Sequence, residues 1–583
     1  MSLRMPENPL LAWRESLRTQ PLATLTTWLL LAMMTAAMLV PIGMAIYKAF
    51  DHEGALSLYW FGRLLHDRTF AQLANGLKLA SITTLLCVVL AVPLAVLRGR
   101  CSFRGQGLLG VAILVPLILP PFVGAMSMRQ LLGRFGVLNL ILERIGLLEV
   151  GPGQLPPDWL EAGLLGVAVI QALHLFPILY LNVSAALANI DPSYPQAARN
   201  LGAGPVRTFF SVTLPLIRPG LFAGGTIVFI WSFTDIGTPL IMNYRDLLPV
   251  RIFDDLNSTY GGKTFAMVFV LLGVSVLLYV LGKFVFGRSQ DVAGSKATVQ
   301  AETHRLGWLG TVGAWLAFGF VLVLAILPHV GVILWALADN WINTILPSDY
   351  TFEHMRSVVT SDQTYNSIIN SLQYAGISTF VDIALGTLAA WLIVRTRAVG
   401  RGLLDAMVML PLAVPGLILA AGYVAVTVPG STLAKMGISP GNNALPLLVI
   451  AYSVRRIPFV VRGVSAGLQQ VPVSLEEAAR NLGSSRTGAA RRITLPLIAA
   501  NMIAAGVLTF AFAMLEVSDS LVLAQRSTDY PITKQIYILF TSGTGESVNV
   551  AAALGVYGMV LLGGTMALAS LLLGKKLGAI FRA

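Results

Sequence analysis

The chain has 583 residues, of which 56% are hydrophobic and only 12% are charged, and its mean hydropathy is +0.75. Soluble globular domains carry about 25% charged residues, so this composition excludes an ordinary soluble enzyme and predicts a polytopic membrane protein. The net charge of +12 does not indicate nucleic-acid binding, because the basic residues are unevenly placed along the predicted topology.

A membrane-spanning helix needs roughly 20 apolar residues. Windows of that length predict an all-α protein with twelve spans. The first six spans are expected at 24–48, 72–97, 107–130, 162–187, 219–241 and 264–286, and the second six at 308–338, 366–394, 403–427, 445–467, 499–522 and 549–574. The first apolar run is too long for the core of a signal peptide, so we expect it to be retained as a span.

More than half of the 40 Lys and Arg residues lie on one side of this predicted topology. By the positive-inside rule that side is cytoplasmic, and both termini are expected there. The two cysteines, Cys87 in a predicted span and Cys101 in a cytoplasmic loop, indicate neither a disulfide framework nor a metal cluster.

The two halves of the chain repeat each other. The run "NGLKLASITTLLCVVL" from Asn75 matches "NSLQYAGISTFVDIAL" from Asn370, 295 positions later, while "LFPILYLNVSAALANI" matches "RIPFVVRGVSAGLQQV" 281 positions later. The difference, 295 − 281 = 14 residues, is an insertion in the first copy within the predicted outer loop around 131–161. An even number of spans per copy makes the repeats parallel, and we expect them to form a pseudo-dimer.

The repeat sets the expected domain organisation. It comprises a cytoplasmic N-terminal segment (1–23), a first six-span unit (24–286), a cytoplasmic linker (287–307), a second six-span unit (308–574) and a cytoplasmic tail (575–583).

A polar segment on the predicted cytoplasmic side separates the fourth and fifth spans of each copy. It reads "QAARNLGAGPVRTFFSVTLPLI" from Gln196 and "EAARNLGSSRTGAARRITLPLI" from Glu477. The pattern predicts a short Ala-rich helix, a glycine turn and a second short helix that ends at "LP". A helix with such small side chains buries little of itself, so it suits a docking piece for a separate cytoplasmic partner.

These segments resemble the EAA loop of the permease subunits of ATP-binding-cassette (ABC) importers. The resemblance implies that each segment is a coupling helix that docks on an ATPase subunit. The residues that match the loop are Gln196, Ala197, Ala198, Gly202, Leu214 and Pro215 in the first copy, and Glu477, Ala478, Ala479, Gly483, Leu495 and Pro496 in the second. Gln196 departs from the usual Glu, which puts a charged contact on that side in question. The alternative is that both segments are amphipathic linkers at the membrane surface.

The chain is not expected to be an ATPase. The best candidate for a phosphate-binding loop, Gly262-Lys263-Thr264, has Asn257 where the motif needs a glycine, and it falls in a predicted outer loop. The resemblance therefore implies that ATP and Mg²⁺ bind to a partner, and we predict no cofactor, metal site or catalytic residue in this chain.

Ionisable residues inside predicted spans are costly and are candidates for function. Asp235 and Glu516 occupy matching places in the two fifth spans, and Asp519 follows one turn after Glu516. Arg455 and Arg456 lie in the tenth span, with His174 at the place that matches Arg455. Two interpretations stay open for these six residues: they line a substrate pathway, or they form ion pairs and cap broken helices.

The resemblance implies a substrate as well as a class. Fused double permeases of this layout, with runs such as "FTDIGTPL" and "MLPLAVPGLILAAGY", resemble ferric-iron importers most closely, with aminoethylphosphonate, thiamine and polyamine permeases as near relatives. It implies a bacterial inner-membrane protein with two ATPase copies and a periplasmic substrate-binding protein as partners. The alternative class is an ion-coupled secondary transporter, which would explain the intramembrane carboxylates but not the two polar segments. A membrane scaffold has no feature in its favour.

Overall fold

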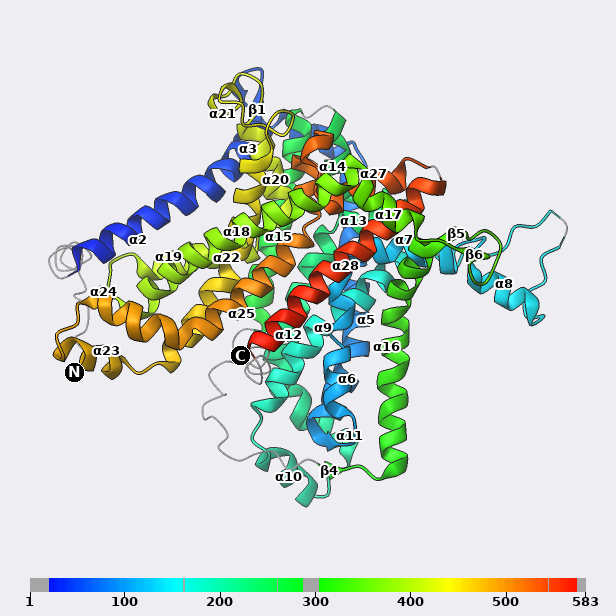
Figure 1. Cartoon of the computed structure of the whole chain (residues 1–583), viewed down its shortest axis with the longest axis horizontal. Helices are drawn as coiled ribbons and strands as arrows, with labels where there is room; N and C mark the ends of the chain where they lie inside the picture. The colour runs from blue at the N-terminus through cyan, green and yellow to red at the C-terminus, as the bar shows by residue number, and fades with distance from the viewer. Residues whose placement is uncertain are drawn as a thin grey trace. The chain divides into compact units, whose positions relative to one another are not determined.

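A computed structural model describes residues 20–286 and 304–573, except 152, 161–162, 259–260 and 544. Most of the expected N-terminal segment, most of the linker and the expected C-terminal tail lie outside the described residues. Within them the fold is helical, as predicted, and the strands are two or three residues long (Figure 1). They are β1 (Asp51–His52), β2 (Ala55–Leu56), β3 (Cys101–Ser102), β4 (His304–Arg305), β5 (Ala338–Asn340) and β6 (Asp349–Tyr350).

The α-helices of the first copy run from α2 to α15. They are α2 (Pro21–Met34), α3 (Val40–Phe50), α4 (Tyr59–Leu65), α5 (Thr69–Arg100), α6 (Gln106–Ala112), α7 (Pro121–Leu132), α8 (Val137–Arg144), α9 (Leu164–Ala188), α10 (Ser193–Asn200), α11 (Pro205–Thr208), α12 (Leu214–Thr234), α13 (Gly237–Ile241), α14 (Leu248–Ser258) and α15 (Gly262–Phe286).

The second copy repeats this order from α16 onward. Its helices are α16 (Trp308–Leu337), α17 (Glu353–Thr360), α18 (Asp362–Arg395), α19 (Arg401–Met409), α20 (Gly416–Val426), α21 (Thr432–Lys435), α22 (Leu445–Gln470), α23 (Val473–Asn481), α24 (Arg486–Ala489), α25 (Leu495–Met514), α26 (Ser518–Leu523), α27 (Ile532–Thr541) and α28 (Gly545–Leu573).

Nine helical runs in the described part of the chain are long and apolar enough to cross a membrane, and two bent helix pairs would raise the number to eleven. The remaining expected span is α22. It has 26 residues, but its three arginines, Arg455, Arg456 and Arg462, make it less apolar than the others. The structure thus contains a helix at each of the twelve expected places.

The two bent pairs are the third spans of the two copies, and proline explains each bend. The helices on either side of Pro120 meet at 92°, and those on either side of Pro415 meet at 102°. Both prolines have extended backbone, with ψ of 137° and 140°, and each stands directly before the helix that follows. Neither has an N–H to continue the preceding helix, and the ring also disfavours helical geometry at the residue before it. The same break therefore occurs in both copies.

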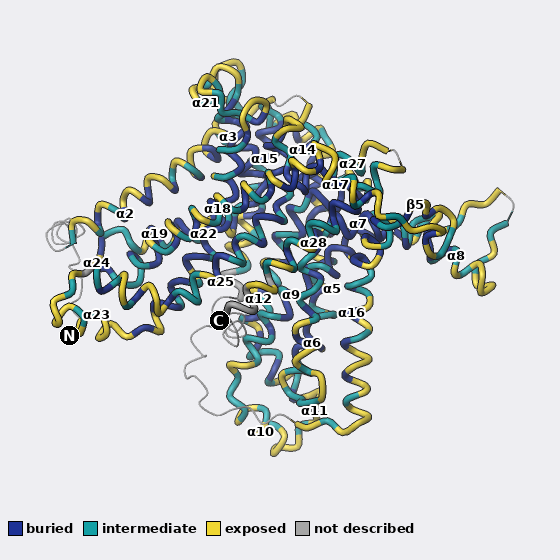
Figure 2. The backbone as a smooth tube through the Cα atoms, in the orientation of Figure 1, coloured by how far each residue is buried: buried dark blue, intermediate teal, exposed yellow. Residues whose placement is uncertain are grey.

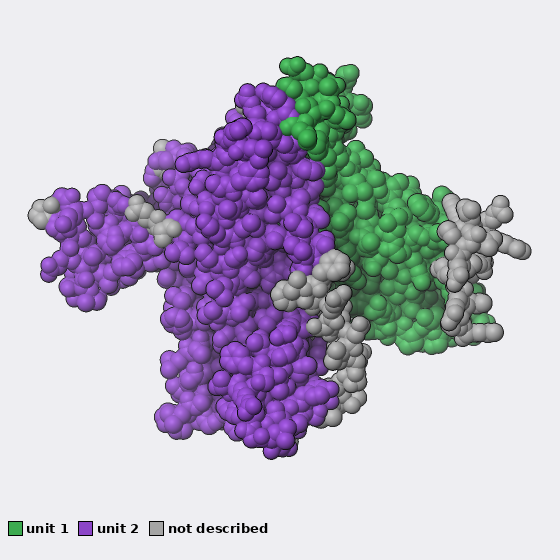
Figure 3. Space-filling view, turned by 180° about the vertical axis from the view of Figure 1, so that it is seen from behind, with its two compact units in different colours: residues 1–58, 366–534, 561–583 green, residues 59–365, 535–560 purple. Residues whose placement is uncertain are grey.

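The chain forms two compact units (Figure 3). Unit 1 comprises residues 1–58, 366–534 and 561–583, and unit 2 comprises 59–365 and 535–560. The units interleave the repeats, because the first span of each copy groups with the other copy's helices. In unit 1, Leu30 and Leu31 of α2 share a core with Leu404 and Val460.

Unit 2 is built in the corresponding way. Phe318 and Ala325 of α16 share a core with Leu109, Ile113 and Phe176, and all five side chains are buried. Each unit therefore needs a helix from both copies to complete its apolar interior. Because lipid is as apolar as these side chains, close van der Waals packing between them, rather than their removal from water, stabilises the unit.

Candidate functional site

The two polar segments have one local structure in both copies. Each consists of a short helix (α10 or α23), a glycine with positive φ, a second short helix (α11 or α24), five residues of π-helix, and a long helix that begins at Leu-Pro (α12 or α25). The φ angles are +81° at Gly202 and +87° at Gly483. This left-handed conformation favours glycine over any residue with a Cβ.

The backbone hydrogen bonds explain why the first helix ends at this glycine. In the second copy, Ser484 N–H donates to Ala479 C=O at 3.0 Å and Gly483 N–H donates to Arg480 C=O at 3.0 Å. The first copy has the same pair of bonds, from Ala203 and Gly202. This pair of hydrogen bonds is the Schellman motif, which closes a helix with a left-handed residue. The predicted first helix and glycine turn are therefore confirmed. The prediction that the second helix ends at Leu-Pro is wrong, because Pro205–Thr234 and Thr487–Met514 are continuous helical runs and the proline stands at the first turn of α12 or α25, where it is tolerated.

The surface of these segments is open within the described structure. Neither α10 nor α23 has a buried residue, and Leu201 and Leu482, which come just before the glycines, are each 89% exposed. Figure 2 shows α10 and α23 mostly in the colours of exposed and intermediate residues. Among the predicted coupling residues, those that are exposed are Gln196, Ala197, Gly202, Glu477, Ala478, Gly483, Leu495 and Pro496, and those that are half-buried are Ala198, Leu214, Pro215 and Ala479.

In each copy an arginine at the end of an earlier span makes a polar contact with this region, to the first helix in the second copy and to the π-helical residues before α12 in the first. In the second copy, Glu476 accepts a hydrogen bond from Thr494 Oγ1 at 2.8 Å and pairs with Arg395 Nε at 3.4 Å. Arg395 also donates to the carbonyls of Leu468 and Val471, at 2.9 and 2.6 Å. The acidic residue that holds α23 in place is thus Glu476, whereas its neighbour Glu477 is left exposed.

The first copy achieves a related contact without an acid. Pro195 stands at the place that matches Glu476, and Arg100, which matches Arg395, donates directly to Thr213, which matches Thr494. Sequence reasoning missed these residues. The signal was present, since Arg, Thr and their spacing recur in both copies.

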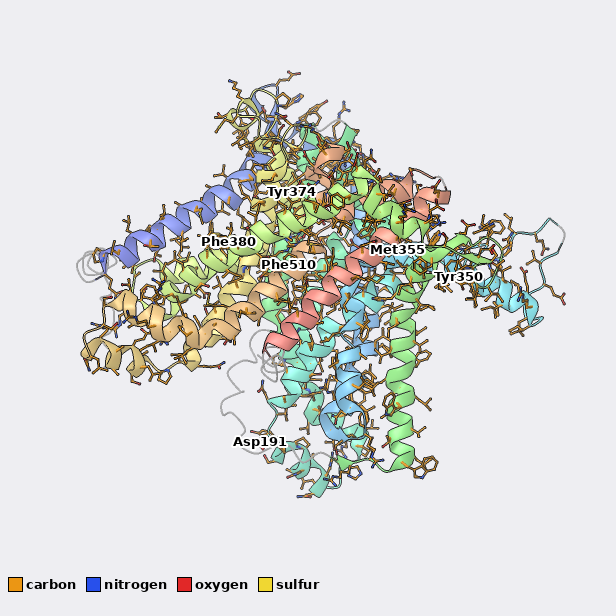
Figure 4. The ribbon with its side chains drawn as sticks, viewed as in Figure 1. Asp191, Tyr350, Met355, Tyr374, Phe380 and Phe510 are labelled. Carbon is orange, nitrogen blue, oxygen red and sulfur yellow. The ribbon has the colours of Figure 1, made fainter. Side chains whose placement is uncertain are left out.

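Asp191 lies just before α10, at the tip of unit 2 where Figure 4 labels it. It accepts a hydrogen bond from Ser193 N–H at 2.9 Å, which holds the pKa of the carboxyl below its usual value. This contact fixes the entry of the chain into α10.

A buried charge cluster lies in unit 1 where α25 ends and α26 begins. Arg455 Nη1 pairs with Glu516 Oε1 at 2.6 Å and with Asp519 Oδ2 at 3.2 Å, and Arg456 pairs with the other oxygen of Glu516. Arg456 also donates to the carbonyl of Phe512 at 2.7 Å. Two positive and two negative charges therefore neutralise each other.

The matching place in unit 2 has no such cluster. Asp235 accepts hydrogen bonds from Gly237 N–H at 2.9 Å and Thr238 N–H at 3.3 Å, at the start of α13, and from Gln171 Nε2 at 2.9 Å. His174 instead contacts the carbonyl of Pro116 at 2.9 Å. The six candidate residues are thus divided between two places, and each carboxylate has partners within its own unit.

Asp382 is a buried carboxylate that sequence reasoning missed. It lies within α18, its side chain is fully buried, and neither of its oxygens has a hydrogen-bond partner among the described residues. Cys87 stands at the matching place of the first copy, 295 positions earlier. A hydropathy window hides such a residue because one carboxylate hardly lowers the average of a 34-residue helix.

Lys263, from the sequence that most nearly matched a phosphate-binding loop, has a structural partner. Its Nζ pairs with Asp67 Oδ2 at 2.6 Å, and Arg251 pairs with the same oxygen at 2.5 Å. Arg251, and then Lys263, hold the pKa of Asp67 well below its usual range. Among the described residues, no group of three His, Cys, Asp or Glu side chains is placed to hold a metal ion.

Comparison with known proteins identifies the class. The family model of the inner-membrane component of binding-protein-dependent transport systems matches residues 80–289 and 382–581, once in each repeat. The chain belongs to this family. It is therefore a multi-pass inner-membrane permease of an ABC importer, and a transport subunit rather than the ATPase. The alternative of an ion-coupled secondary transporter is wrong.

Individual relatives extend over most of the permease. The ferric transport system permease FbpB of Actinobacillus pleuropneumoniae is 27% identical over 84% of this chain and 69% of its own length. A putative ferric transport permease of Haemophilus influenzae, FbpB 1, is also 27% identical, over 78% of this chain and 70% of its own. The molybdenum permease ModB of Escherichia coli is 27% identical over 40% of this chain and 99% of its own length.

Proposed function

We propose that this permease imports ferric iron with energy from two ATPase subunits, which dock on the two segments built around Gly202 and Gly483. A periplasmic binding protein delivers the substrate, and the two halves give access to each side of the membrane in turn. Both termini and both segments lie in the cytoplasm. Aminoethylphosphonate, thiamine and polyamines are the alternative substrates.

The observation that carries the coupling role is the identical local structure of the two segments. Both present an exposed helix followed by a leucine that is 89% exposed, on a base fixed by Arg395 with Glu476 or by Arg100 with Thr213. An apolar side chain this exposed on a rigid turn is typical of a surface that another protein covers. An interfacial linker would not need the same Schellman turn, and an Arg–Thr pair at matching places, in both copies.

The assignment of ferric iron rests on the two FbpB relatives, whose similarity extends over most of both halves. The molybdenum permease matches a single half. The buried charges do not argue for a substrate, because Glu516 and Asp519 pair with arginines of the same unit.

A glycine substitution with a matched control tests the coupling role. Gly483→Val places a β-branched residue at φ +87°, while Gly430→Val does the same at φ +89° in the loop before α21, and neither site has an atom within 4 Å of the new Cβ. The backbone strain is thus similar, roughly 1–2 kcal/mol. We expect Gly483→Val to abolish co-purification of the ATPase and ATP-driven uptake, whereas Gly430→Val retains both.

Uptake of radioactive ferric iron by cells that also express the neighbouring binding protein and ATPase tests the substrate. Unlabelled aminoethylphosphonate, thiamine and spermidine serve as competitors. Iron uptake that requires the ATPase supports the proposal. Uptake of a competitor instead of iron overturns the substrate and leaves the coupling role standing, while equal loss of uptake in both glycine variants overturns the coupling role.

A further inference from the structure

The loop at 133–163, between α7 and α9 of unit 2, exposes an unusual number of large apolar side chains. It contains the residues inserted only in the first copy. Leu147 is 75% exposed, and the other exposed members are Phe135, Ile141, Ile145, Leu155 and Trp159. In the corresponding loop of the second copy, 427–444, the described residues include one exposed large apolar side chain, Met436.

This exposure belongs to a built structure rather than to a loose chain. Asn139 Nδ2 donates to the carbonyls of Arg134 and Pro157 at 2.8 and 2.7 Å, and Asn139 Oδ1 accepts from Trp159 Nε1 at 2.7 Å. Trp159 N–H further donates to Leu132 C=O at 3.2 Å. These bonds close the two ends of the loop on one buried asparagine, so α8 is held at a defined place.

Helix α8 is buried at its beginning and exposed at its end. Val137 and Asn139 are buried within the loop, whereas Ile141, and Ile145 directly after the helix, are exposed. Arg144, in the last turn of the helix, is exposed beside them. Exposed apolar side chains beside an arginine, in a loop between membrane-spanning segments, are typical of segments that lie in the membrane interface.

The position of the loop indicates which surface covers its exposed apolar side chains. Both ends of the loop continue directly into membrane-spanning segments, and Gln130 of α7 bonds to the carbonyl of Trp341 at 2.7 Å, in the strand pair that follows α16. Ile342, Tyr350 and Phe352 of that neighbouring hairpin are exposed as well. Figure 1 shows α8 leaving unit 2 sideways from the end of α16 rather than continuing along its axis, and Figure 4 labels Tyr350 at the base of this projection.

The charge of the loop identifies the kind of contact. Residues 133–163 contain two basic residues, Arg134 and Arg144, and four acidic ones, Glu143, Glu149, Asp158 and Glu161, which gives 2 − 4 = −2. A net negative loop is not attracted to anionic headgroups. A contact between this loop and a bilayer would therefore rest on its apolar side chains.

We propose that the 133–163 loop lies in the interface of the bilayer, with Ile141, Ile145 and Leu147 in contact with phospholipid acyl chains. This role is independent of the substrate and of the ATPase. It gives the first half of the permease a lateral membrane anchor that the second half lacks.

The test places a fluorescent probe at exposed positions at the end of α8 and directly after it. In a full-length Cys101→Ser background, where the remaining Cys87 is buried, Ile145→Cys and Leu147→Cys carry an environment-sensitive label. Glu143→Cys, exposed on the same helix two positions away from both Ile141 and Ile145, is the matched control. The labelled permease is placed in phosphatidylcholine nanodiscs with and without phospholipid that carries a nitroxide near the top of its acyl chain.

We expect the nitroxide lipid to quench the labels at 145 and 147 at least twofold more than the label at 143, and 30% anionic lipid to leave this difference unchanged. Quenching of all three labels only by a water-soluble quencher would overturn the proposal. Labels that become shielded only when the purified binding protein is added would also overturn it, in favour of a protein-docking surface.

Discussion

Replacing Glu516 by Gln is expected to destabilise the permease far more than replacing its counterpart Asp235 by Asn. Glu516 is 6% exposed and pairs with both Arg455 and Arg456. Its amide would leave Arg456, which is 4% exposed, with a buried charge and no carboxylate partner. Removing one member of a buried ion pair costs about 3–5 kcal/mol.

Asp235 has a different role, so its replacement costs less. It has no arginine partner and accepts hydrogen bonds from Gly237, Thr238 and Gln171. Asparagine is favoured at helix starts and retains one acceptor oxygen, so the expected cost is about 1–2 kcal/mol. Glu516→Gln is therefore expected to cost roughly 1–4 kcal/mol more than Asp235→Asn.

The assay is thermal unfolding of the purified permease in detergent, followed by tryptophan fluorescence at one scan rate. For a unit of this size, the Glu516→Gln variant should unfold on the order of 5–10 °C lower than the native chain. Adding Arg456→Met should recover at least half of that loss, because it removes the unpaired charge. Equal shifts for the two single variants would refute the ion-pair reasoning, and a stable Glu516→Gln variant that no longer transports would favour a place in the substrate pathway.

Three further variants test other contacts. Glu476→Ala should speed hydrogen exchange in α23 at least threefold and lower uptake, because α23 loses its links to Thr494 and Arg395. The control Glu477→Ala should leave exchange unchanged. Equal exchange rates in the two variants would contradict the role of Glu476 in holding α23. Asp67→Asn should reduce the fall in unfolding temperature between about pH 5 and pH 3. The pKa of Asp67 in the folded chain lies below its usual 3.8, so this carboxylate stabilises the fold above that pH and loses its contribution as the pH falls. Parallel curves of unfolding temperature against pH for the variant and the native chain would count against this. Asp382→Cys, which copies Cys87, should raise the unfolding temperature by a few degrees, because it removes a buried carboxylate without a hydrogen-bond partner. A fall in the unfolding temperature would contradict this reasoning.

Much of the fold could be predicted because hydropathy and repetition act over long stretches. Twenty apolar residues in a row have few alternatives to a helix, and the two copies check each other, so even the arginine-rich α22 was placed. The glycine turns at 202 and 483 could be predicted for a local reason, since the left-handed backbone selects the residue.

The pairing of side chains could not be predicted in the same way. The EAA motif singles out Glu477 rather than Glu476. Which of the two acids contacts Arg395 depends instead on the face of α23 that turns towards this arginine. Asp235 and Glu516 occupy matching places in the two copies. Asp235 accepts hydrogen bonds at the start of a helix, whereas Glu516 pairs with arginine, because the matching residue on another helix is His174 in the first copy and Arg455 in the second. Such choices are set by the rotation of packed helices, which no hydropathy pattern records.

The interleaving of the two units has a consequence for how the chain is made. The hydroxyl of Tyr423 donates to the carbonyl of Ala37, 386 residues earlier in the chain, and Gly422 packs closely against Pro41. The first span therefore enters the membrane long before the helices that it packs against have been synthesised. During that interval its inner face meets only lipid or an insertion factor, and unit 1 closes late because its contacts are so distant in sequence. A chain that ends in the linker would contain the first span without the helices it packs against. The packing of the first span is therefore completed only after the second half has been synthesised.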